Sequence, residues 1–437
     1  VSIFEEQAKT YRQLQQVLVT QKRPKEALEI AERGRTRALV EILFKRANSK
    51  LEEIIIPPTP NLTEIQQIAQ QQNATLVEYS VTPDEIYVWV IPPQGKIQFR
   101  SVPLKDISLK ELVKNTRNNQ LNVRGRGSDD STPKENNSQN YLQQLHQLLI
   151  EPIAEFLPKD EQQRVIFIPH QELFLVPFVA LQDEDNKYLI KKHTILTAPS
   201  IQALSLSQKN KQAVKNPNAS LSGGSSVLIV GNPTMPSGGV GKDLKPLQQL
   251  PGAEKEANNI AQMFGTQAII AEQATESAIV QKMASAKLIH LATHGLLDDI
   301  NAIGSPGAIA LSTDAKNDGF LTTSEIMELF GLSGQQKLQA DLVVLSACDT
   351  GRGDIKGEGV IGLSRAFMAS GVPTLVVSLW KVPDDETVNL MTEFYFNIYE
   401  RKFDKAKAMR QAMLTMIEEV DPDPQKWAAF TVIGKAE

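Results

Sequence analysis

The amino-acid sequence predicts an α/β protein in which a mainly parallel β-sheet is sandwiched by helices. From Val227 to the end of the 437-residue chain, short apolar runs with strand spacing alternate with helical patterns. This alternation is typical of a mainly parallel sheet, whose strands are apolar throughout because helices cover both faces. Two of the apolar runs also end in a reactive side chain close to a glycine. Because ligands of such sheets bind beyond the carboxyl ends of the strands, the fold class predicts where functional residues lie.

Residues 1–50 are predicted to form an α-helical arm. Apolar residues recur at helical spacing in two segments, and Pro24 suits the first turn of the second helix. The pattern Y-x-x-L, followed by K-R-P-K-E-A-L-E, resembles one tetratricopeptide repeat, and a generic helical hairpin fits it equally well. One repeat cannot bury its own apolar face, and the chain begins with Val1 rather than methionine. We therefore expect either further repeats upstream or packing of the arm against the next domain.

Residues 61–207 are predicted to form a second unit, separated from the arm by the proline-rich segment Ile54–Pro60. Turns containing Pro and Gly favour a meander of three strands. The expected strands span Thr75–Val81, Glu85–Ile91 and Lys96–Val102, and the expected helices span Leu62–Gln72, Asp106–Asn119 and Tyr141–Leu157. A short strand is expected at Val165–Pro169, continued by the apolar run Leu173–Leu181. The polar segment Gln120–Ser138 is expected to be a disordered surface loop.

Residues 226–437 follow a second polar linker, Gln208–Ser225, and carry the alternating pattern that predicts the main sheet. The expected strands span Val227–Gly231, Gln267–Ala271, Lys287–Gly295, Gly307–Ser312, Asp341–Gly351 and Thr374–Leu379. The expected helices span Ala253–Phe264, Glu276–Ala284, Thr323–Phe330, Gly359–Ser370, Pro383–Tyr399 and Lys405–Glu419.

Composition excludes several classes of function. The net charge of −5 lacks the basic footprint of a nucleic-acid-binding protein. No apolar run approaches the roughly 18 residues that span a bilayer, and no secretory hydrophobic segment is evident. A single cysteine excludes an internal disulfide and fits a reducing cytoplasm. We therefore expect a cytoplasmic protein that contacts neither nucleic acid nor membrane.

The candidate site comes from two of the predicted strands. The stretch KLIHLATHG ends in His294 and Gly295, and DLVVLSACDTG contains Cys348, the only cysteine in the chain. If these strands are parallel neighbours, an imidazole and a thiol emerge together, as a cysteine nucleophile and its base require. A lone cysteine after a strand is more often a small buried hydrophobe. Its place beside a loop that opens with Asp349, and the His-Gly pair upstream, favour a cysteine peptidase site.

Two other kinds of site fail on spacing. His290 and His294 form H-x-x-x-H, but Leu291 replaces the glutamate of the zincin motif, and i and i+4 on a strand lie about 13 Å apart. His290 is therefore expected to be a packed or hydrogen-bonded core histidine. The run Gly238–Lys242 lacks the first glycine of a phosphate loop, and Asp243 replaces its Ser or Thr. No metal and no cofactor are expected.

The remaining candidates are weaker. No Gly-x-Ser-x-Gly elbow supports a Ser-His-Asp site. The glycine-rich segment Gly351–Gly359 is either a flexible connection or a mobile active-site loop. No role is assigned to His146, His170 or His193.

Several blocks of the sequence resemble the CHAT domain family (caspase HetF associated with tetratricopeptide repeats), a member of the caspase and separase clan of cysteine peptidases. The resemblance runs from about Leu62 to Ile433. Its blocks are LVEYSV, IPHQELFLVPFVAL, LIVGNP, LPGAEKEANNIA, LIHLATHG, VLSACDTG, GEGVIGLSRAFMASGVPTLVVSLWKVPD, the pair Phe394-Tyr395, and WAAFTVIG. His294 also precedes Cys348 by roughly 50 residues, the interval of caspase-type enzymes.

The resemblance implies a caspase-like sheet sandwiched by helices, with residues 61–207 as a non-catalytic, caspase-like half and residues 226–437 as the catalytic half. It maps the catalytic dyad onto His294 and Cys348. The Cys348 thiolate would attack a peptide carbonyl and form a thioester, with His294 as acid and base. Backbone N–H groups of Gly295 and Cys348 are the expected oxyanion donors.

Specificity and partners are further expectations. Relatives in the clan that cleave after a basic P1 residue need an acidic pocket floor, for which Asp349, Asp314, Asp298 and Asp299 are candidates. The expected partners are a protein substrate and a regulatory protein that binds the helical arm. Two alternatives remain, namely a catalytically silent regulatory scaffold and a cysteine-dependent transferase or amidase that acts on small molecules.

Overall fold

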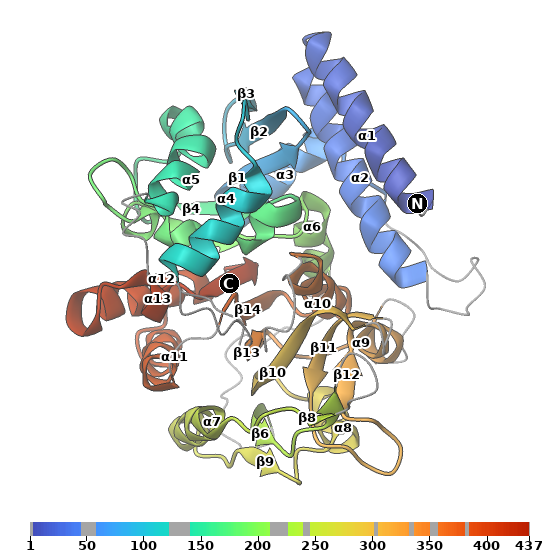
Figure 1. The fold of residues 1–437 in the computed structure, drawn as a ribbon, viewed down its shortest axis with the longest axis vertical. Coiled ribbons are helices and arrows are strands. Elements are labelled where there is room, and N and C mark those ends of the chain that lie inside the picture. The colour runs from blue at the N-terminus through green and yellow to red at the C-terminus, as the bar shows by residue number, and fades with distance from the viewer. Residues whose placement is uncertain are drawn as a thin grey trace.

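The computed structural model describes residues 3–44, 58–121, 140–209, 226–238, 245–300, 305–331, 336–349, 357–380 and 384–436. Among the helices in these ranges, none is both long and apolar enough to cross a membrane. Figure 1 shows a sheet that runs through the whole molecule, with helices on either side of it and the N-terminal helical arm along one end.

The N-terminal arm is a helical hairpin of α1 (Ile3–Thr20) and α2 (Pro24–Phe44). It packs against the following domain, which confirms one of the two expectations for its apolar face. The indole Nε1–H of Trp89 donates to the Pro24 carbonyl at 2.7 Å, and Ser80 Oγ donates to Gln15 Oε1 at 2.6 Å. The arm is therefore tied to the adjacent sheet through both of its helices.

The predicted meander is confirmed. Helix α3 (Leu62–Gln72) begins with a capping box between Asn61 and Glu64 and ends at Asn73, whose left-handed φ of 45° suits asparagine. Three antiparallel neighbours follow, β1 (Ala74–Val81), β2 (Glu85–Ile91) and β3 (Gln98–Pro103). Every residue of β1 is buried, because helices cover one face of it and β2 and β4 flank it.

The next segment differs from the prediction at two prolines. Its elements are α4 (Leu109–Asn115), α5 (Tyr141–Leu149), β4 (Arg164–Ile168), β5 (Thr194–Thr197) and α6 (Ile201–Lys209). The helix expected over Tyr141–Leu157 changes to a 3-10 turn after Leu149, because Pro152 cannot continue the α-helical ladder. The run Leu173–Leu181 is not strand-like. It forms two short 3-10 turns on either side of Pro177, and its side chains enter the core.

The C-terminal half has the predicted alternation of strands and helices. Its strands are β6 (Val227–Pro233), β7 (Ser237–Gly238), β8 (Lys245–Pro246), β9 (Ile269–Ala271), β10 (Leu288–Ile300), β11 (Ser305–Ala310), β12 (Phe320–Thr322), β13 (Leu342–Asp349), β14 (Thr374–Ser378) and β15 (Phe430–Gly434). Its helices are α7 (Pro251–Met263), α8 (Glu276–Met283), α9 (Thr323–Phe330), α10 (Gly357–Ala369), α11 (Asp384–Tyr399), α12 (Lys405–Thr415) and α13 (Pro424–Trp427).

One mixed sheet of 13 strands joins both halves in the order β12-β11-β10-β13-β14-β15-β5-β4-β1-β2-β3, with β6 also paired with β10 and β9 paired with β6. Parallel pairs form its centre, and antiparallel strands lie at its ends and at β15. The predicted α/β class with a mainly parallel sheet is confirmed. Strand β15 pairs with both β14 and β5, so the halves share one sheet.

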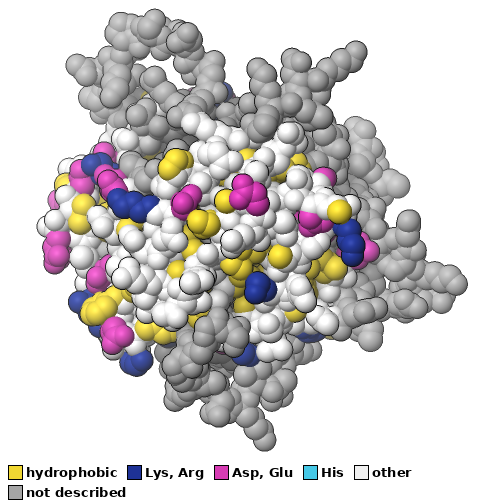
Figure 2. Space-filling view, turned by 90° about the horizontal axis from the view of Figure 1, so that it is seen from below, with side chains coloured by type: hydrophobic (Ala, Val, Ile, Leu, Met, Phe, Trp, Pro, Cys, Tyr) yellow, Lys and Arg dark blue, Asp and Glu magenta, His cyan; other side chains and the backbone are white. Residues whose placement is uncertain are grey.

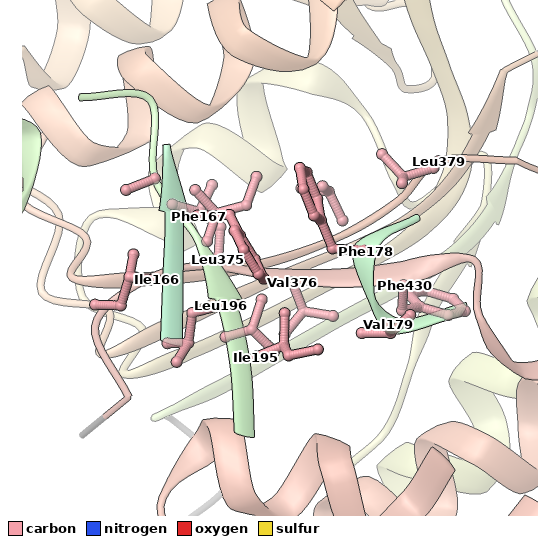
Figure 3. Close-up of a cluster of buried hydrophobic side chains, with 14 of the residues drawn as sticks. Ile166, Phe167, Phe178, Val179, Ile195, Leu196, Leu375, Val376, Leu379 and Phe430 are labelled. Atoms are coloured by element: carbon pink, nitrogen blue, oxygen red, sulfur yellow. The ribbon is translucent and has the colours of Figure 1, made fainter. Parts of the chain in front are cut away.

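Buried apolar side chains from both halves pack together where the halves meet. Figure 3 shows side chains of β4, β5, β14 and β15 in one cluster with Phe178 and Val179 from the second 3-10 turn. The rings of Phe167 and Phe178 stack with centroids 4.3 Å apart. Since each fully buried side chain of this size contributes about 1.5–3 kcal/mol, the cluster holds the halves together.

Charged side chains are mixed on the end of the molecule that carries α7, α8 and β9. Figure 2 views this end, where the described acidic and basic side chains are interspersed among apolar ones. The described part of this face therefore carries no stripe of one sign.

Glu276, the first residue of α8, provides a test of the buried charge in this half. Burial, with the nearby Glu325 and Asp318 carboxylates, raises the pKa of Glu276 to about 7, and the Gly319 N–H donates to Glu276 Oε2 at 3.2 Å. A raised carboxyl pKa stabilises the fold below the unfolded pKa, and this stability is lost as pH rises toward 7. We expect Glu276→Gln, which keeps the acceptor, to raise the free energy of unfolding by about 1–2 kcal/mol at pH 8 and not at pH 4. Urea unfolding at both pH values measures this difference, and an equal effect at both would contradict the assignment.

Candidate active site

The two strands of the candidate site are parallel neighbours, as the sequence predicts. The pairing of β10 with β13 stays in step from Leu288 opposite Leu342 to Gly295 opposite Asp349. In this register His294 lies opposite Cys348. The backbones of register partners on neighbouring strands lie about 5 Å apart across the sheet. The fold therefore brings these two positions together from segments that are distant in the sequence.

Strand β10 does not end at Gly295, as the sequence had indicated, but continues to Ile300. Its edge opposite β13 pairs with β6 up to Ala292 and with β11 from Gly295 onward. The extension could not be read from the sequence because it depends on pairing with β11, which follows later in the chain. His294 consequently lies between two pairing partners of β10, where the sheet divides.

His294 is held by a backbone group that the sequence analysis missed. Its side chain is buried, with 5% exposure, and its Nε2 lies 2.6 Å from the carbonyl oxygen of Gln248. A carbonyl only accepts hydrogen bonds, so Nε2 carries the proton, and a neutral ring then has its lone pair on Nδ1. Gln248 lies in the segment between β8 and α7. Any residue can supply a backbone carbonyl, so no sequence signal marks this contact.

His290 is a core histidine, as predicted. It has no exposed surface, and its Nδ1 is 3.0 Å from the hydroxyl of Tyr395 on α11. Burial raises the pKa of that hydroxyl well above its ordinary value. The His290 Nε2 lies 3.1 Å from Oε1 of Glu256 on α7, but the angles are too poor for a hydrogen bond. His290 therefore belongs to the packing of α7 and α11 on β10.

Glu256 also reaches the second strand of the site. Its Oε2 accepts a hydrogen bond from Ser346 Oγ at 3.0 Å, two residues before Cys348 on β13. One buried carboxylate on α7 therefore contacts both β10 and β13. Sequence patterns do not reveal such a pairing, because its residues are far apart in the chain.

Part of the predicted site lies outside the described structure. This holds for the side chains of Cys348 and Asp349, for those of Asp298 and Asp299, and for most of the runs Gly351–Gly359 and Gly238–Lys242 and of the linkers Gln120–Ser138 and Gln208–Ser225. Their assigned roles remain predictions.

The structure describes Asp314 and Gly295, and each makes contacts within the fold. The Asp314 carboxylate accepts backbone N–H groups of Lys316 and Ser277, and these bonds lower its pKa. Asp314 thus orders a turn next to α8. Gly295 pairs with Asp349 on one side and Ile309 on the other, so its backbone lies within the sheet. Among the described residues, no group of three or more His, Cys, Asp or Glu is placed to hold a metal ion.

His170 and His193, to which the sequence analysis assigned no role, are partly buried and buried, respectively. The Val81 N–H donates to Nδ1 of His170 at 2.9 Å, and burial, followed by the charges of Arg35, Arg12 and Arg365, lowers the pKa of His170 well below its ordinary value. Burial lowers the pKa of His193 to about 4. Both rings are therefore neutral near pH 7, and neither lies on β10 or β13.

The fold and its strand order define the class of protein. Separase in the Saccharomyces cerevisiae separase–securin complex superposes on 95% of this chain with a TM-score of 0.55 and 9% sequence identity, and the match covers 34% of that chain. A likeness at this identity shows the fold alone, which is the caspase-like α/β fold.

The chain belongs to the CHAT domain family, whose model matches residues 139–435. This confirms the resemblance over residues 139–435, which include β10 and β13, whereas the block LVEYSV lies before the match. CHAT domains are caspase-like domains related to cysteine peptidases.

Two curated relatives carry the name tetratricopeptide repeat protein 28. The Homo sapiens protein is 24% identical over 563 aligned positions, and the Mus musculus protein is 23% identical over 562. Each alignment covers 99% of this chain and 22% of the relative, so the chain spans about a fifth of the length of these relatives.

Proposed function

We propose that this chain is a cysteine endopeptidase whose dyad is His294 and Cys348. The observation that carries the proposal is the register of β10 and β13, in which these two residues lie opposite each other. The Gln248 carbonyl supports it, because a fixed imidazole is what a base beside a thiol requires. Membership of a domain family related to cysteine peptidases supports it independently.

The proposed reaction starts with transfer of the Cys348 thiol proton to His294. With Nε2–H bound to Gln248, the accepting atom is Nδ1. The thiolate attacks the peptide carbonyl carbon, and the carbonyl electrons move to its oxygen. Collapse of this tetrahedral species breaks the C–N bond, and the imidazolium gives its proton to the leaving amine. His294 then deprotonates a water molecule, which hydrolyses the thioester and releases the thiolate.

The oxyanion would be stabilised by backbone N–H groups at Gly295 and Cys348. Glycine at position 295 lets substrate backbone approach this edge without a side chain in the way. Both positions lie at the end of the parallel pairing of β10 with β13. This role requires each N–H to be free of the strand pairing when substrate binds, and Gly295 has Asp349 and Ile309 as pairing partners in the described sheet.

Substrates with a basic P1 residue are proposed on the chemistry of Asp349. It follows the nucleophile directly and lies opposite Gly295 in the strand register, at the same edge as the dyad. We expect Asp349→Asn to lower kcat/KM for peptides with P1 Arg or Lys about tenfold or more, and to leave other P1 residues unaffected. A panel of fluorogenic peptides that differ only at P1 measures this. Equal losses for all P1 residues, or cleavage restricted to non-basic P1, would remove Asp349 from this role.

A protein partner is proposed to bind the helical arm. Leu14 and Val17 lie about one turn apart on α1 and are 41% and 50% exposed, so the arm presents two neighbouring apolar side chains on its outer side. The opposite side of α1, including Gln15, already packs on the sheet. The same arm would serve the alternative function, a regulatory scaffold without catalysis.

The two functions are separated by peptide cleavage. We expect the chain, with its arm partner where one is needed, to cleave a mixed fluorogenic peptide library and Cys348→Ala to leave no cleavage above background. Ser364→Ala, a buried site on α10, is the matched control for a small-residue change that spares the dyad. Equal cleavage by wild type and Cys348→Ala would exclude the dyad, and partner binding without any cleavage would favour the scaffold.

A further inference from the structure

The segment that holds His294 has no secondary structure of its own. Residues 247–250 connect β8 with α7, and the Gln248 carbonyl on this segment accepts the hydrogen bond of His294 Nε2. The orientation of the ring therefore depends on whatever fixes this connection. The Leu247 N–H donates to the Pro236 carbonyl at 3.1 Å, and the Leu250 N–H donates to Asn232 at the end of β6.

Asn232 fixes the end of this connection that leads into α7. The Leu250 N–H donates to Asn232 Oδ1 at 2.7 Å, and Asn232 Nδ2 donates to Glu254 Oε2 at 2.9 Å. The side chain is buried, with 8% exposure. Leu250 is the N-cap of α7, and its own side chain makes no capping hydrogen bond. Asn232, at the end of β6, instead binds the backbone at the helix start. Both polar atoms of the buried Asn232 amide therefore bond to the first turn of α7.

The backbone around Asn232 is built for this contact. Its φ of 44° is in the left-handed region, which asparagine tolerates better than most residues. At the preceding Gly231, a Cβ would lie 2.4 Å from Ala257 Cβ and 2.6 Å from the Ala253 carbonyl oxygen, so only glycine lets α7 approach this closely. Gly231 pairs with Ala292 on β10, which places Asn232 at the edge of the sheet where His294 follows.

We propose that Asn232 is a positioning residue for the His294 base. By holding the Leu250 N–H it fixes the Gln248 carbonyl two residues away, and that carbonyl fixes the protonated nitrogen and the plane of the imidazole. The inference rests on the proposed function, in which His294 activates Cys348. It adds a residue that contacts neither the substrate nor the reacting atoms and acts through Gln248.

The sole cysteine makes the effect measurable without a substrate. The test is the second-order rate of alkylation of the full chain by iodoacetamide at pH 6, with the melting temperature measured alongside. We expect Asn232→Gly, which keeps the left-handed backbone, to slow alkylation about fivefold, the effect of one hydrogen bond. Asn232→Asp combined with Glu254→Gln keeps the acceptor for Leu250 without placing two carboxylates in contact, and should retain the rate. Glu254→Ala removes only the other contact and should also retain it.

Two comparisons separate positioning from a loosened fold. Asn73→Gly changes another left-handed asparagine, at the end of α3 and away from the site, and should leave alkylation unchanged. In a His294→Ala background, Asn232→Gly should slow alkylation no further, because its target is gone. If Asn232→Gly does not fold, Asn232→Ser, whose side chain is too short to reach Leu250, takes its place in the same assay.

The outcomes distinguish the two proposals. Unchanged alkylation in Asn232→Gly, or equal slowing with and without His294, overturns the positioning role. If His294→Ala itself leaves alkylation unchanged, the proposed function fails first.

Discussion

Alanine at position 294 is expected to slow alkylation of Cys348 about tenfold at pH 6. A thiol with an ordinary pKa near 8.5 is less than about 1% thiolate at this pH, whereas a thiol paired with an imidazole is largely ionised. The gain in thiolate is offset in part because a thiolate of lower pKa is a weaker nucleophile, which leaves a net effect of about an order of magnitude. Because Cys348 is the only cysteine, every alkylation event reports on this site.

The shape of the pH profile is the sharper criterion. In the wild type the rate should level off below pH 7, and in His294→Ala it should keep falling about tenfold per pH unit. His290→Gln is the matched control, since His290 lies four residues before His294 on the same strand and contacts Tyr395. Identical profiles for wild type and His294→Ala would show that His294 does not activate the thiol.

Replacing Arg35 with methionine is expected to cost about 3–5 kcal/mol of the free energy of unfolding. Arg35 on α2 is buried, and its Nε donates to Glu78 Oε1 of β1 at 3.2 Å. Its other nitrogens donate to the Pro169 carbonyl at 2.5 Å and to the Tyr79 carbonyl. Methionine would fill much of the space but leave a buried carboxylate and two carbonyls without their donor.

The loss should depend on pH. Burial, with the charge of Glu32, raises the pKa of Glu78 well above its ordinary value, and burial also raises the pKa of Glu32. Arg35 lowers both pKa values, so they rise further without it. A raised carboxyl pKa gives stability that is present at low pH and lost as pH rises, so Arg35→Met should be more damaging at pH 8 than at pH 5.

Urea unfolding at the two pH values measures this loss. Arg23→Met removes an exposed ion pair with Glu26 on the same arm and should have little effect, which makes it the matched control. Equal stability of Arg35→Met and Arg23→Met would show that the buried network does not anchor the arm.

The sequence was informative where one segment decides the outcome. Period-two apolar runs and helical spacing predicted the elements of the C-terminal half, and the parallel pairing of β10 and β13 followed from their alternation with helices. Helices α3 and α9 begin with capping boxes in the structure, in which two residues three positions apart satisfy each other's backbone N–H groups. Local chemistry is sufficient at such positions, because neighbours in the sequence supply the contacts.

The features that the sequence did not predict share a physical cause, because each depends on contacts with distant parts of the chain. Strand β5 is short, and its place between β4 and β15 is set by pairing with both. The extension of β10 past Gly295 requires β11. At the site, His294 depends on the carbonyl of Gln248, and Glu256 joins Ser346 to the region of His290. Such contacts are made by the fold and leave no motif.

The proposed activity is the cleavage of proteins by His294 and Cys348 acting together. The most direct test is to incubate the full chain with cell lysate and compare the new protein N-termini produced by wild type, Cys348→Ala and His294→Ala. The proposed mechanism predicts a defined set of new N-termini in the wild type that is absent from both variants. The same N-termini in all three preparations would contradict it.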